Sequence, residues 1–268
     1  MSTLNAQIAE TFSRLKEQKP LIHHITNFVV MNDAANVTLH LGALPVMAHA
    51  AEEVAAMASV AGALVLNLGT LTPSWLESMR LAGQAANKRS TPVILDPVGA
   101  GATPFRTAAA QQLMAELDLS VVRGNAGEIG ALMGRGGEVR GVESTKNLAD
   151  PAAVAREAAR AWGAVVAITG ERDLVSDGER VLAVANGHTW LTTLTGTGCM
   201  ATTAVACFVA TQSEPLVATA GALAAYGLAA ERAAGLARGP ASFKVGFFDA
   251  LYALNANDLE EGVRVTEL

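Results

Sequence analysis

The sequence predicts an α/β protein of three layers, in which helices cover both faces of a central, mainly parallel sheet. Short β-rich runs alternate with helix-length segments along most of the chain, and strands that alternate with helices form parallel sheets. Several of these runs, such as 63–68 and 164–169, are apolar throughout, which is typical of strands buried on both faces. No long linker or repeat interrupts the pattern, so we expect residues 1–268 to form one domain.

The first half of the chain is expected to alternate strands with helices after an opening helix. Pro20 ends a charged amphipathic helix, and Pro73 begins another at a position where its missing N–H has no cost. Glu52 and Glu53 are expected in the first turn of a third helix, as the helix dipole prefers. The expected helices are 4–19, 29–41, 51–60, one that begins at residue 73, 107–117 and 126–133, and the expected strands are 21–25, 44–47, 63–68, 92–95 and 120–122.

The second half continues this alternation and then becomes helical. A Gly-rich polar loop over 135–147 precedes a helix that Asp150 caps. Asp177 and Gly178 join two β-rich runs as a hairpin. The expected elements are helix 151–162, strand 164–169, hairpin strands 173–176 and 181–185, and Ala-rich helices 198–212, 215–235 and 242–257.

The composition excludes several classes of protein. The chain is 51% apolar and 16% charged, with a net charge of −6 and no basic stripe, so we expect no nucleic acid partner. Residues 1–20 lack the apolar core of a signal peptide, and the most apolar later stretch, 215–230, is shorter than a bilayer requires. Cys199 and Cys207 lie two turns apart on one expected helix and cannot pair. We therefore expect a soluble, cytoplasmic protein with no membrane partner.

The turn at 195–202, T-G-T-G-C-M-A-T, is the most informative stretch of the sequence. Gly196 and Gly198 precede a helix-length apolar run, so free N–H groups at a helix N-terminus offer a site for an anion such as phosphate. Cys199 lies in the first turn, where the dipole favours its thiolate. For the turn alone, glycines that only relieve crowding are the simpler interpretation. If the turn binds an anion, Thr197, Gly198 and Cys199 are the expected catalytic residues.

Polar residues follow several expected strands, and ligands bind beyond the carboxyl ends of strands in such sheets. Asp96 and Glu128 are suited to hold Mg²⁺ directly or through waters, and Arg123 is a fork-shaped donor for phosphate oxygens. With the glycine turn, these are the parts that phosphoryl transfer needs. Taken singly, Asp96 also fits a turn before a proline, and Glu128 fits the first turn of a helix. The other residues of this set are Thr26, Asn27, Met47, Asn67, Asn125, Thr169 and Glu171.

Motifs of other enzyme classes are missing or weak. The sequence has no G-x-x-x-x-G-K-[ST] and no G-x-S-x-G, which excludes a P-loop NTPase and a hydrolase elbow. Gly196-x-Gly198-x-x-Ala201 matches the loose dinucleotide fingerprint. No strand with a ribose-binding acid follows about 20 residues later, so only this weak match supports an oxidoreductase.

Six motifs, in order along the chain, closely resemble the hydroxyethylthiazole kinase family. They are H-H-I-T-N-F-V (23–29), L-P-V-M-A (44–48), L-N-L-G-T-L (66–71), D-P-V-G-A-G-A-T (96–103), R-G-N-A-G-E-I (123–129) and T-G-T-G-C (195–199). The resemblance implies a ribokinase-like fold and the phosphorylation of the hydroxyl of 4-methyl-5-(2-hydroxyethyl)thiazole by MgATP, a salvage step in thiamine biosynthesis. It also implies a homotrimer with active sites between subunits.

The resemblance also implies roles for individual residues. It places Met47, Asn27 and Gly196 against the thiazole, Arg123 and Thr169 on ATP, and Asp96 and Glu128 around Mg²⁺. In most ribokinase-like enzymes an aspartate that acts as a base ends the glycine turn, whereas this chain has Cys199 there, as thiazole kinases do. We expect Cys199 to take or share the proton of the substrate hydroxyl. A packing role alone is the alternative.

Two other functions fit the same motifs. The first is a ribokinase-like kinase for another small alcohol, such as the hydroxymethylpyrimidine half of thiamine. The second is a binding or regulatory protein on this fold that performs no catalysis. The acidic pair and the glycine turn argue against the second alternative.

Overall fold

One central sheet organises the computed structural model, which describes residues 3–135, 139–140, 143–144 and 150–268. Its strands are β1 (Leu21–Ile25), β2 (Leu44–Val46), β3 (Ala63–Asn67), β4 (Val93–Asp96), β5 (Val121–Asn125), β8 (Val165–Thr169), β9 (Asp173–Ser176), β10 (Val181–Val184) and β11 (Val265–Glu267). Within the described residues their order is β11-β10-β9-β8-β5-β4-β3-β1-β2. The run from β8 to β2 is parallel, and the remaining strands add an antiparallel edge.

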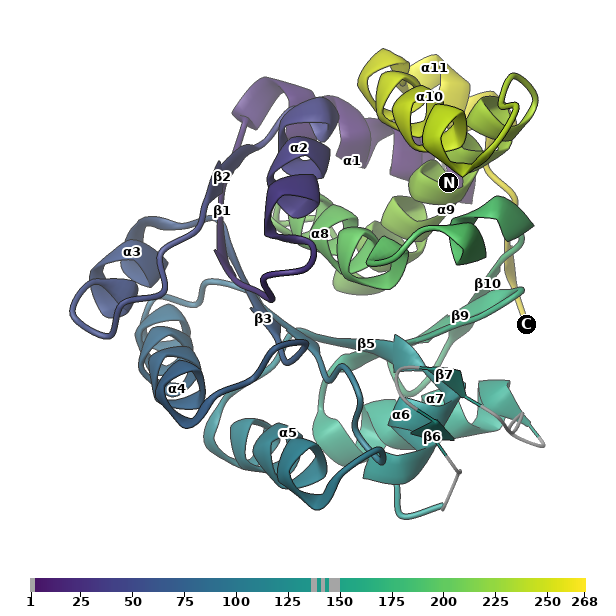
Figure 1. Cartoon of the computed structure of the whole chain (residues 1–268). Helices are drawn as coiled ribbons and strands as arrows, with labels where there is room; N and C mark the ends of the chain where they lie inside the picture. The colour runs from purple at the N-terminus through teal and green to yellow at the C-terminus, as the bar shows by residue number, and fades with distance from the viewer. Residues whose placement is uncertain (1–2, 136–138, 141–142, 145–149) are drawn as a thin grey trace.

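Helices cover both faces of this sheet (Figure 1). One side carries α1 (Leu4–Gln18), α2 (Met31–Leu41), α8 (Thr197–Val209), α9 (Pro215–Ala234), α10 (Pro240–Ala253) and α11 (Ala256–Gly262), and the other carries α3 (Val54–Val60), α4 (Pro73–Lys88), α5 (Pro104–Glu116), α6 (Ala126–Leu132) and α7 (Pro151–Trp162). A 3₁₀ helix, η1 (Thr189–Thr193), precedes α8. The predicted architecture of three layers around a mainly parallel sheet is confirmed.

Alternate residues of the central strands enter two separate cores. In β3, Ala63 and Val65 join the core on the side of α8 and α9, whereas Leu64 and Leu66 join the core on the side of α4 and α5. All four side chains are buried. Both faces of the strand therefore need apolar residues, which explains why the sequence here does not alternate with polar positions.

The order of the strands reverses between β1 and β3. From β1 the chain moves outward to β2, and it then returns to β3 and proceeds in the other direction through β4, β5 and β8. Helix α2 follows β1 on one face of the sheet, and α4 follows β3 on the other (Figure 1). Connections that leave toward opposite faces create the switch point at which α/β sheets bind ligands.

Helix α8 is buried along most of its length and lies against β3 and β4. Small side chains such as Ala201 and Ala204 permit this close approach to the sheet. At its start, the Tyr226 hydroxyl of α9 donates to the carbonyl oxygen of Thr197 at 2.9 Å, so α9 fixes the position of the α8 N-terminus. In the described part of the chain, no helix is both long and apolar enough to cross a membrane.

Side chains explain why some helices begin elsewhere than predicted. Helix α2 begins at Met31 rather than at residue 29, because Oδ1 of Asn27 accepts the N–H groups of Val29 and Val30 and holds them in a turn. Helix α5 begins three residues early, because Thr103 caps it. Helix α3 begins only at Val54, so the two glutamates expected in its first turn precede it.

The C-terminal region differs most from the prediction. The single helix expected over 242–257 is two helices, because Asn255 breaks the first and caps the second in a reciprocal pair of hydrogen bonds with Asp258. The strand β11 was not predicted. In the loop expected over 135–147, Val139–Arg140 and Glu143–Ser144 pair as the short antiparallel strands β6 and β7, and residues 136–138, 141–142 and 145–147 of that loop lie outside the described residues.

Candidate active site

Polar side chains gather at the edge of the sheet where the parallel strands end. Asn67 and Asp96 end β3 and β4 and are partners in the register of the two strands. Asn125 and Thr169 end β5 and β8 and are partners in the same way. Since neighbouring parallel strands end at one edge, the sheet itself brings these four residues together.

A chain of hydrogen bonds crosses this edge from Asn27 to Thr202. The Asn27 amide donates to Oδ1 of Asn67 at 2.7 Å, and the Asn67 amide donates to Oδ2 of Asp96 at 2.8 Å. The Thr202 hydroxyl of α8 donates to the same Asp96 oxygen at 2.8 Å. The Asn27 amide also lies 3.4 Å from Sγ of Cys199. The loop after β1, two strand ends and the first turns of α8 thus form one network.

Asp96 is the buried acidic centre of this network. Burial raises the pKa of its carboxyl, and the nearby Arg123 and the hydrogen bonds from Thr202 and Asn67 act in the opposite direction. Its Oδ2 atom accepts both of those hydrogen bonds. Its Oδ1 atom is buried without a hydrogen-bond partner among the described residues. That oxygen is therefore free to bind a cation.

Arg123 lies inside β5, not beyond it as the sequence predicted, because the strand continues to Asn125. Its guanidinium donates to the Thr169 hydroxyl at 2.5 Å, and Nη1 lies 3.9 Å from Oδ2 of Asp96. The side chain is only 11% exposed. A buried, fork-shaped cation at this edge is suited to phosphate oxygens.

The glycine turn gives the N-terminus of α8 its close neighbours. Gly196 has a φ of 80° and caps the helix, and a Cβ there would lie 2.1 Å from Val30. A Cβ on Gly198 would lie 2.9 Å from Nη1 of Arg123. Gly198 therefore permits the guanidinium to approach the first-turn N–H groups, which have no acceptors within the helix, and Gly196 permits the close approach of Val30. The Thr197 hydroxyl donates a hydrogen bond to the carbonyl oxygen of Leu191.

The expectation that the helix dipole stabilises a Cys199 thiolate is wrong in this structure. Burial, and then the charge of Asp96, raise the pKa of the thiol to about 12, and hydrogen bonds from Asn67 and Asn27 and the charge of Arg123 only partly oppose this. A helix terminus typically contributes less than burial of a charged group costs. Cys199 is therefore a neutral thiol at physiological pH.

Glu128 lies at the start of α6, where it forms a capping box with Asn125. Its Oε1 atom accepts the N–H of Gly99 at 2.8 Å, and Oε2 accepts the N–H of Asn125 at 2.9 Å. Burial, and then the charge of Asp96, raise its pKa to about 7, against these two hydrogen bonds and Arg123. The carboxyl thus links the loop after β4 to the end of β5.

Met47 follows β2, on the far side of β1 from the acidic centre. It is half-buried. Its carbonyl oxygen lies 3.0 Å from Nδ1 of His49, and Nε2 of the same ring accepts the N–H of Thr26 at 3.1 Å. Through His49, Met47 is held beside the loop that carries Asn27, although it is not part of the hydrogen-bond network around Asp96.

The structure adds residues to those that the sequence selected. The sequence pattern indicates Asn67 only as a strand end, yet Asn67 connects Asn27 to Asp96. Thr202 is not among the residues that the sequence predicts for the site. Its position three residues after Cys199, which places both on one side of a helix, is the signal in the sequence that points to it.

The described residues contain no group of three or more His, Cys, Asp or Glu side chains that could hold a metal ion. This does not conflict with Mg²⁺, which keeps several waters and typically binds one or two carboxylates together with substrate phosphates. The buried, unpartnered Oδ1 of Asp96 fits such a ligand.

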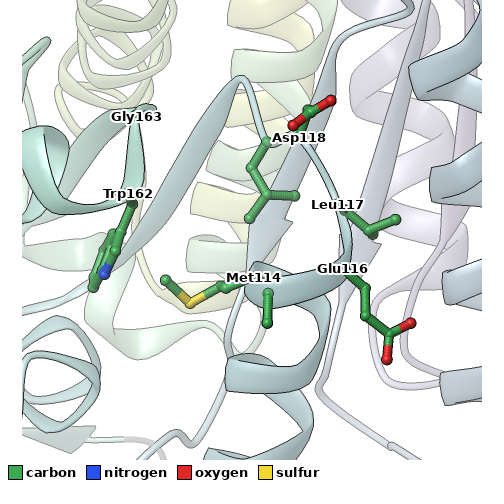
Figure 2. Close-up of a pocket in the computed structure, with 8 residues that line it drawn as sticks. Met114, Glu116, Leu117, Asp118, Trp162 and Gly163 are labelled. Carbon is green, nitrogen blue, oxygen red and sulfur yellow. The ribbon is translucent and has the colours of Figure 1, made fainter.

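A separate hollow of about 340 Å³ lies at the opposite edge of the sheet, where β5 and β8 begin (Figure 2). Met114, Leu117 and Trp162 line it together with Glu116 and Asp118. It is remote from the polar residues at the strand ends and does not belong to the candidate site.

Comparisons with known proteins agree on one family. Residues 12–257 match the model of the hydroxyethylthiazole kinase family. The hydroxyethylthiazole kinase of Chloroflexus aurantiacus is 60% identical over 264 residues, which cover 98% of each chain. That of Desulforudis audaxviator is 58% identical over 268 residues, which cover 100% of this chain and 98% of the relative.

Solved structures agree on the fold. The hydroxyethylthiazole kinase of Pyrococcus horikoshii superposes with a TM-score of 0.90 at 46% identity, over 97% of this chain and 98% of the other. A ribokinase-like superfamily protein from Enterococcus faecalis has a TM-score of 0.62 at 14% identity, over 94% of each chain. The second likeness concerns the fold alone, which is ribokinase-like.

Gly198→Ala is expected to weaken binding of ATP, whose phosphates Arg123 is expected to contact, about tenfold without unfolding the protein. The new Cβ displaces Arg123, and a lost hydrogen bond to a charged group is worth about 1.5 kcal/mol. Helix stability does not suffer, since alanine favours a helix over glycine by about 1 kcal/mol. Titration calorimetry with ATP and a thermal melt measure the two effects.

Gly246→Ala is the matched control. Gly246 also lies in a helix, α10, where a Cβ would meet only ordinary van der Waals contacts with Ala233. Unchanged ATP affinity in Gly198→Ala, or an equal loss in the control, would contradict the role given to the glycine.

Proposed function

This chain belongs to the hydroxyethylthiazole kinase family, and we propose that it transfers the γ-phosphoryl group of ATP to the hydroxyl of 4-methyl-5-(2-hydroxyethyl)thiazole, in the salvage branch of thiamine biosynthesis. The observation that carries this proposal is the meeting of the Asn27–Asn67–Asp96 network with the α8 N-terminus, at Cys199 and Thr202. Phosphoryl transfer depends chiefly on such positioning and on electrostatic stabilisation.

The residues divide into an acceptor side and a donor side. Asn27, Met47 and Gly196 lie toward the loops after β1 and β2 and are proposed to bind the thiazole. Arg123 and Thr169, which share a hydrogen bond, are proposed to bind ATP phosphates. Between the two sides, the first-turn N–H groups of α8 at Thr197 and Gly198 would stabilise the charge on the transferred group.

Asp96 and Glu128 are the proposed residues for Mg²⁺. Mg²⁺, when bound with ATP, neutralises charge on the phosphates. Asp96 offers a buried oxygen that has no hydrogen-bond partner in the described part of the chain. Both Glu128 oxygens accept backbone N–H groups, so this residue suits contact through water and orients the surrounding loop.

Cys199 is proposed to share the proton of the substrate hydroxyl late in the reaction. Its raised pKa, about 12, keeps it a thiol at neutral pH, so Sγ can take that proton only as the thiol's own proton passes to an oxygen of the transferred phosphoryl group, and Cys199 remains a thiol after each turnover. A loose transition state asks little of a base, because the attacking hydroxyl becomes acidic only as its new bond forms. An aspartate at this position would be a more effective acceptor.

We further propose that residues 1–268 act as one domain in the cytoplasm, where a protein with two free thiols, Cys199 and Cys207, persists in the reduced form. We also propose a homotrimer with active sites between subunits. Phe28 and Val29 support this, because they are 67% and 59% exposed although they directly follow Asn27 at the site. A second subunit would cover this apolar surface.

The proposed reaction is tested by ADP production from purified protein with hydroxyethylthiazole and MgATP. We expect ADP only when acceptor, nucleotide and metal are all present. Hydroxymethylpyrimidine, assayed in parallel, distinguishes the runner-up kinase function. Binding of the thiazole without any ADP release would contradict the proposed kinase function and favour a non-catalytic binding protein.

Variants of Cys199 test its role in proton transfer. Cys199→Asp is expected to keep or raise kcat, because a carboxylate accepts the proton more readily, and Cys199→Ala is expected to lower kcat modestly, by about tenfold or less. Cys199→Ser serves as the nearly isosteric control with a neutral hydroxyl. Complete loss of activity in Cys199→Asp, with ATP binding intact, would rule out this account.

The proposed assembly is tested by light scattering of the purified protein. We expect a particle of three chains of 27.5 kDa each, and we expect Phe28→Ser to lower both the mass and the activity. A fully active monomer would contradict the proposed trimer with active sites between subunits.

A further inference from the structure

Arg106 joins two loops that carry the central residues of the candidate site. It is the third residue of α5. Its Nη1 atom donates to the carbonyl oxygens of Leu68 at 2.6 Å and Val98 at 2.8 Å, and Nη2 donates to that of Gly69 at 2.6 Å. In the described part of the chain, every hydrogen bond of this guanidinium goes to a main-chain carbonyl.

These carbonyls belong to the segments that follow two strand ends of the network. Leu68 and Gly69 come directly after Asn67 of β3, and Val98 comes two residues after Asp96 of β4. The two segments also meet through the N–H of Leu68, which donates to the Asp96 carbonyl at 3.1 Å. A single rigid fork that binds both segments fixes the distance between them.

The N–H groups of the loop after β4 are hydrogen-bonded within the protein and do not point to a ligand site. The N–H of Gly99 donates to Glu128, and that of Gly101 donates to the Thr107 hydroxyl at 2.8 Å. The N–H groups of Val98, Ala100 and Ala102 donate to carbonyls within the loop. Since all these donors are occupied, the loop offers no cradle for an anion, despite its two glycines.

Arg106 and Glu128 therefore hold the same loop from two sides, through neighbouring residues. Arg106 binds the carbonyl of Val98, and Glu128 binds the N–H of Gly99. Gly99 has a φ of 77°, and a Cβ there would lie 2.9 Å from Cδ of Arg106. The glycine thus admits the arginine stem at the point where the loop turns.

We propose that Arg106 is a positioning residue for phosphoryl transfer, which holds Asn67 and Asp96 at the spacing their network requires. This inference rests on the proposed kinase function. Without the guanidinium, the loops after β3 and β4 lose their common anchor. Asp96 is then no longer held at a fixed distance from the hydrogen-bonded residues Asn67, Asn27 and Cys199. Such an error in alignment lowers kcat more than it weakens binding of either substrate.

The test combines kinetics with hydrogen exchange in Arg106→Ala and Arg106→Lys. In Arg106→Ala we expect kcat to fall about 10- to 100-fold while the KM values change less than about threefold. Amides in residues 67–71 and 96–102 should exchange faster than in the wild type, with the rest of the sheet unchanged. Arg106→Lys, which can reach one loop at a time, should recover part of both losses.

Arg80→Ala is the matched control, because Arg80 pairs with Glu77 on the surface of α4 and contacts neither loop. It should leave kcat and exchange unchanged. Wild-type exchange in the two loops of Arg106→Ala, an unchanged kcat, or the same defects in Arg80→Ala would each overturn the proposal. If Arg106→Ala does not fold, Arg106→Lys alone decides by the same criteria. If the wild-type protein forms no ADP, the kinase function is refuted instead. The exchange data then still show whether Arg106 holds the two loops together.

Discussion

The buried carboxylate of Asp96 is the constraint on which the rest of the site depends. A carboxylate removed from water is costly unless polar groups or opposite charge compensate it. Asn67 and Thr202 donate to one of its oxygens, and Arg123 lies nearby. These partners come from β3, α8 and β5, so satisfying one acidic group fixes the strand ends and the first turns of α8 relative to one another.

The same charge adds to the effect of burial on the pKa of its neighbours. After burial, it is the next largest cause of the raised pKa of both Cys199 and Glu128. The Cys199 thiol and the Glu128 carboxyl, whose pKa values differ widely in water, are therefore both shifted upward by the charge of Asp96. At the glycine turn, which the sequence indicates as an anion site, the first turn of α8 accordingly carries a neutral thiol, Cys199, whose pKa the buried Asp96 helps to raise.

Much of this arrangement can be predicted from residue patterns, and there are physical reasons why the rest cannot. Uniform apolar runs located the parallel strands, and Asp150 located the start of α7, because burial on both faces and N-capping leave local signals. The position of Arg123 within β5 and the pKa of Cys199 depend on neighbours distant in sequence. The strand β11 is too short to leave a periodic signal, and Asn255 divides α10 from α11 inside a segment that reads as continuous helix.

The reversal of strand order between β1 and β3 has a consequence for how such a catalyst can diverge. Asn27 and Asn67 form their hydrogen bond across this boundary. The proposed alcohol-binding residues Asn27 and Met47 belong to loops on the β1 and β2 side, whereas Asp96, Arg123 and Thr169, which are proposed to bind the metal and the nucleotide, lie on the other side. With this division, mutations in the loops after β1 and β2 can change the acceptor side of the site while the residues on the β4, β5 and β8 side keep their own hydrogen bonds.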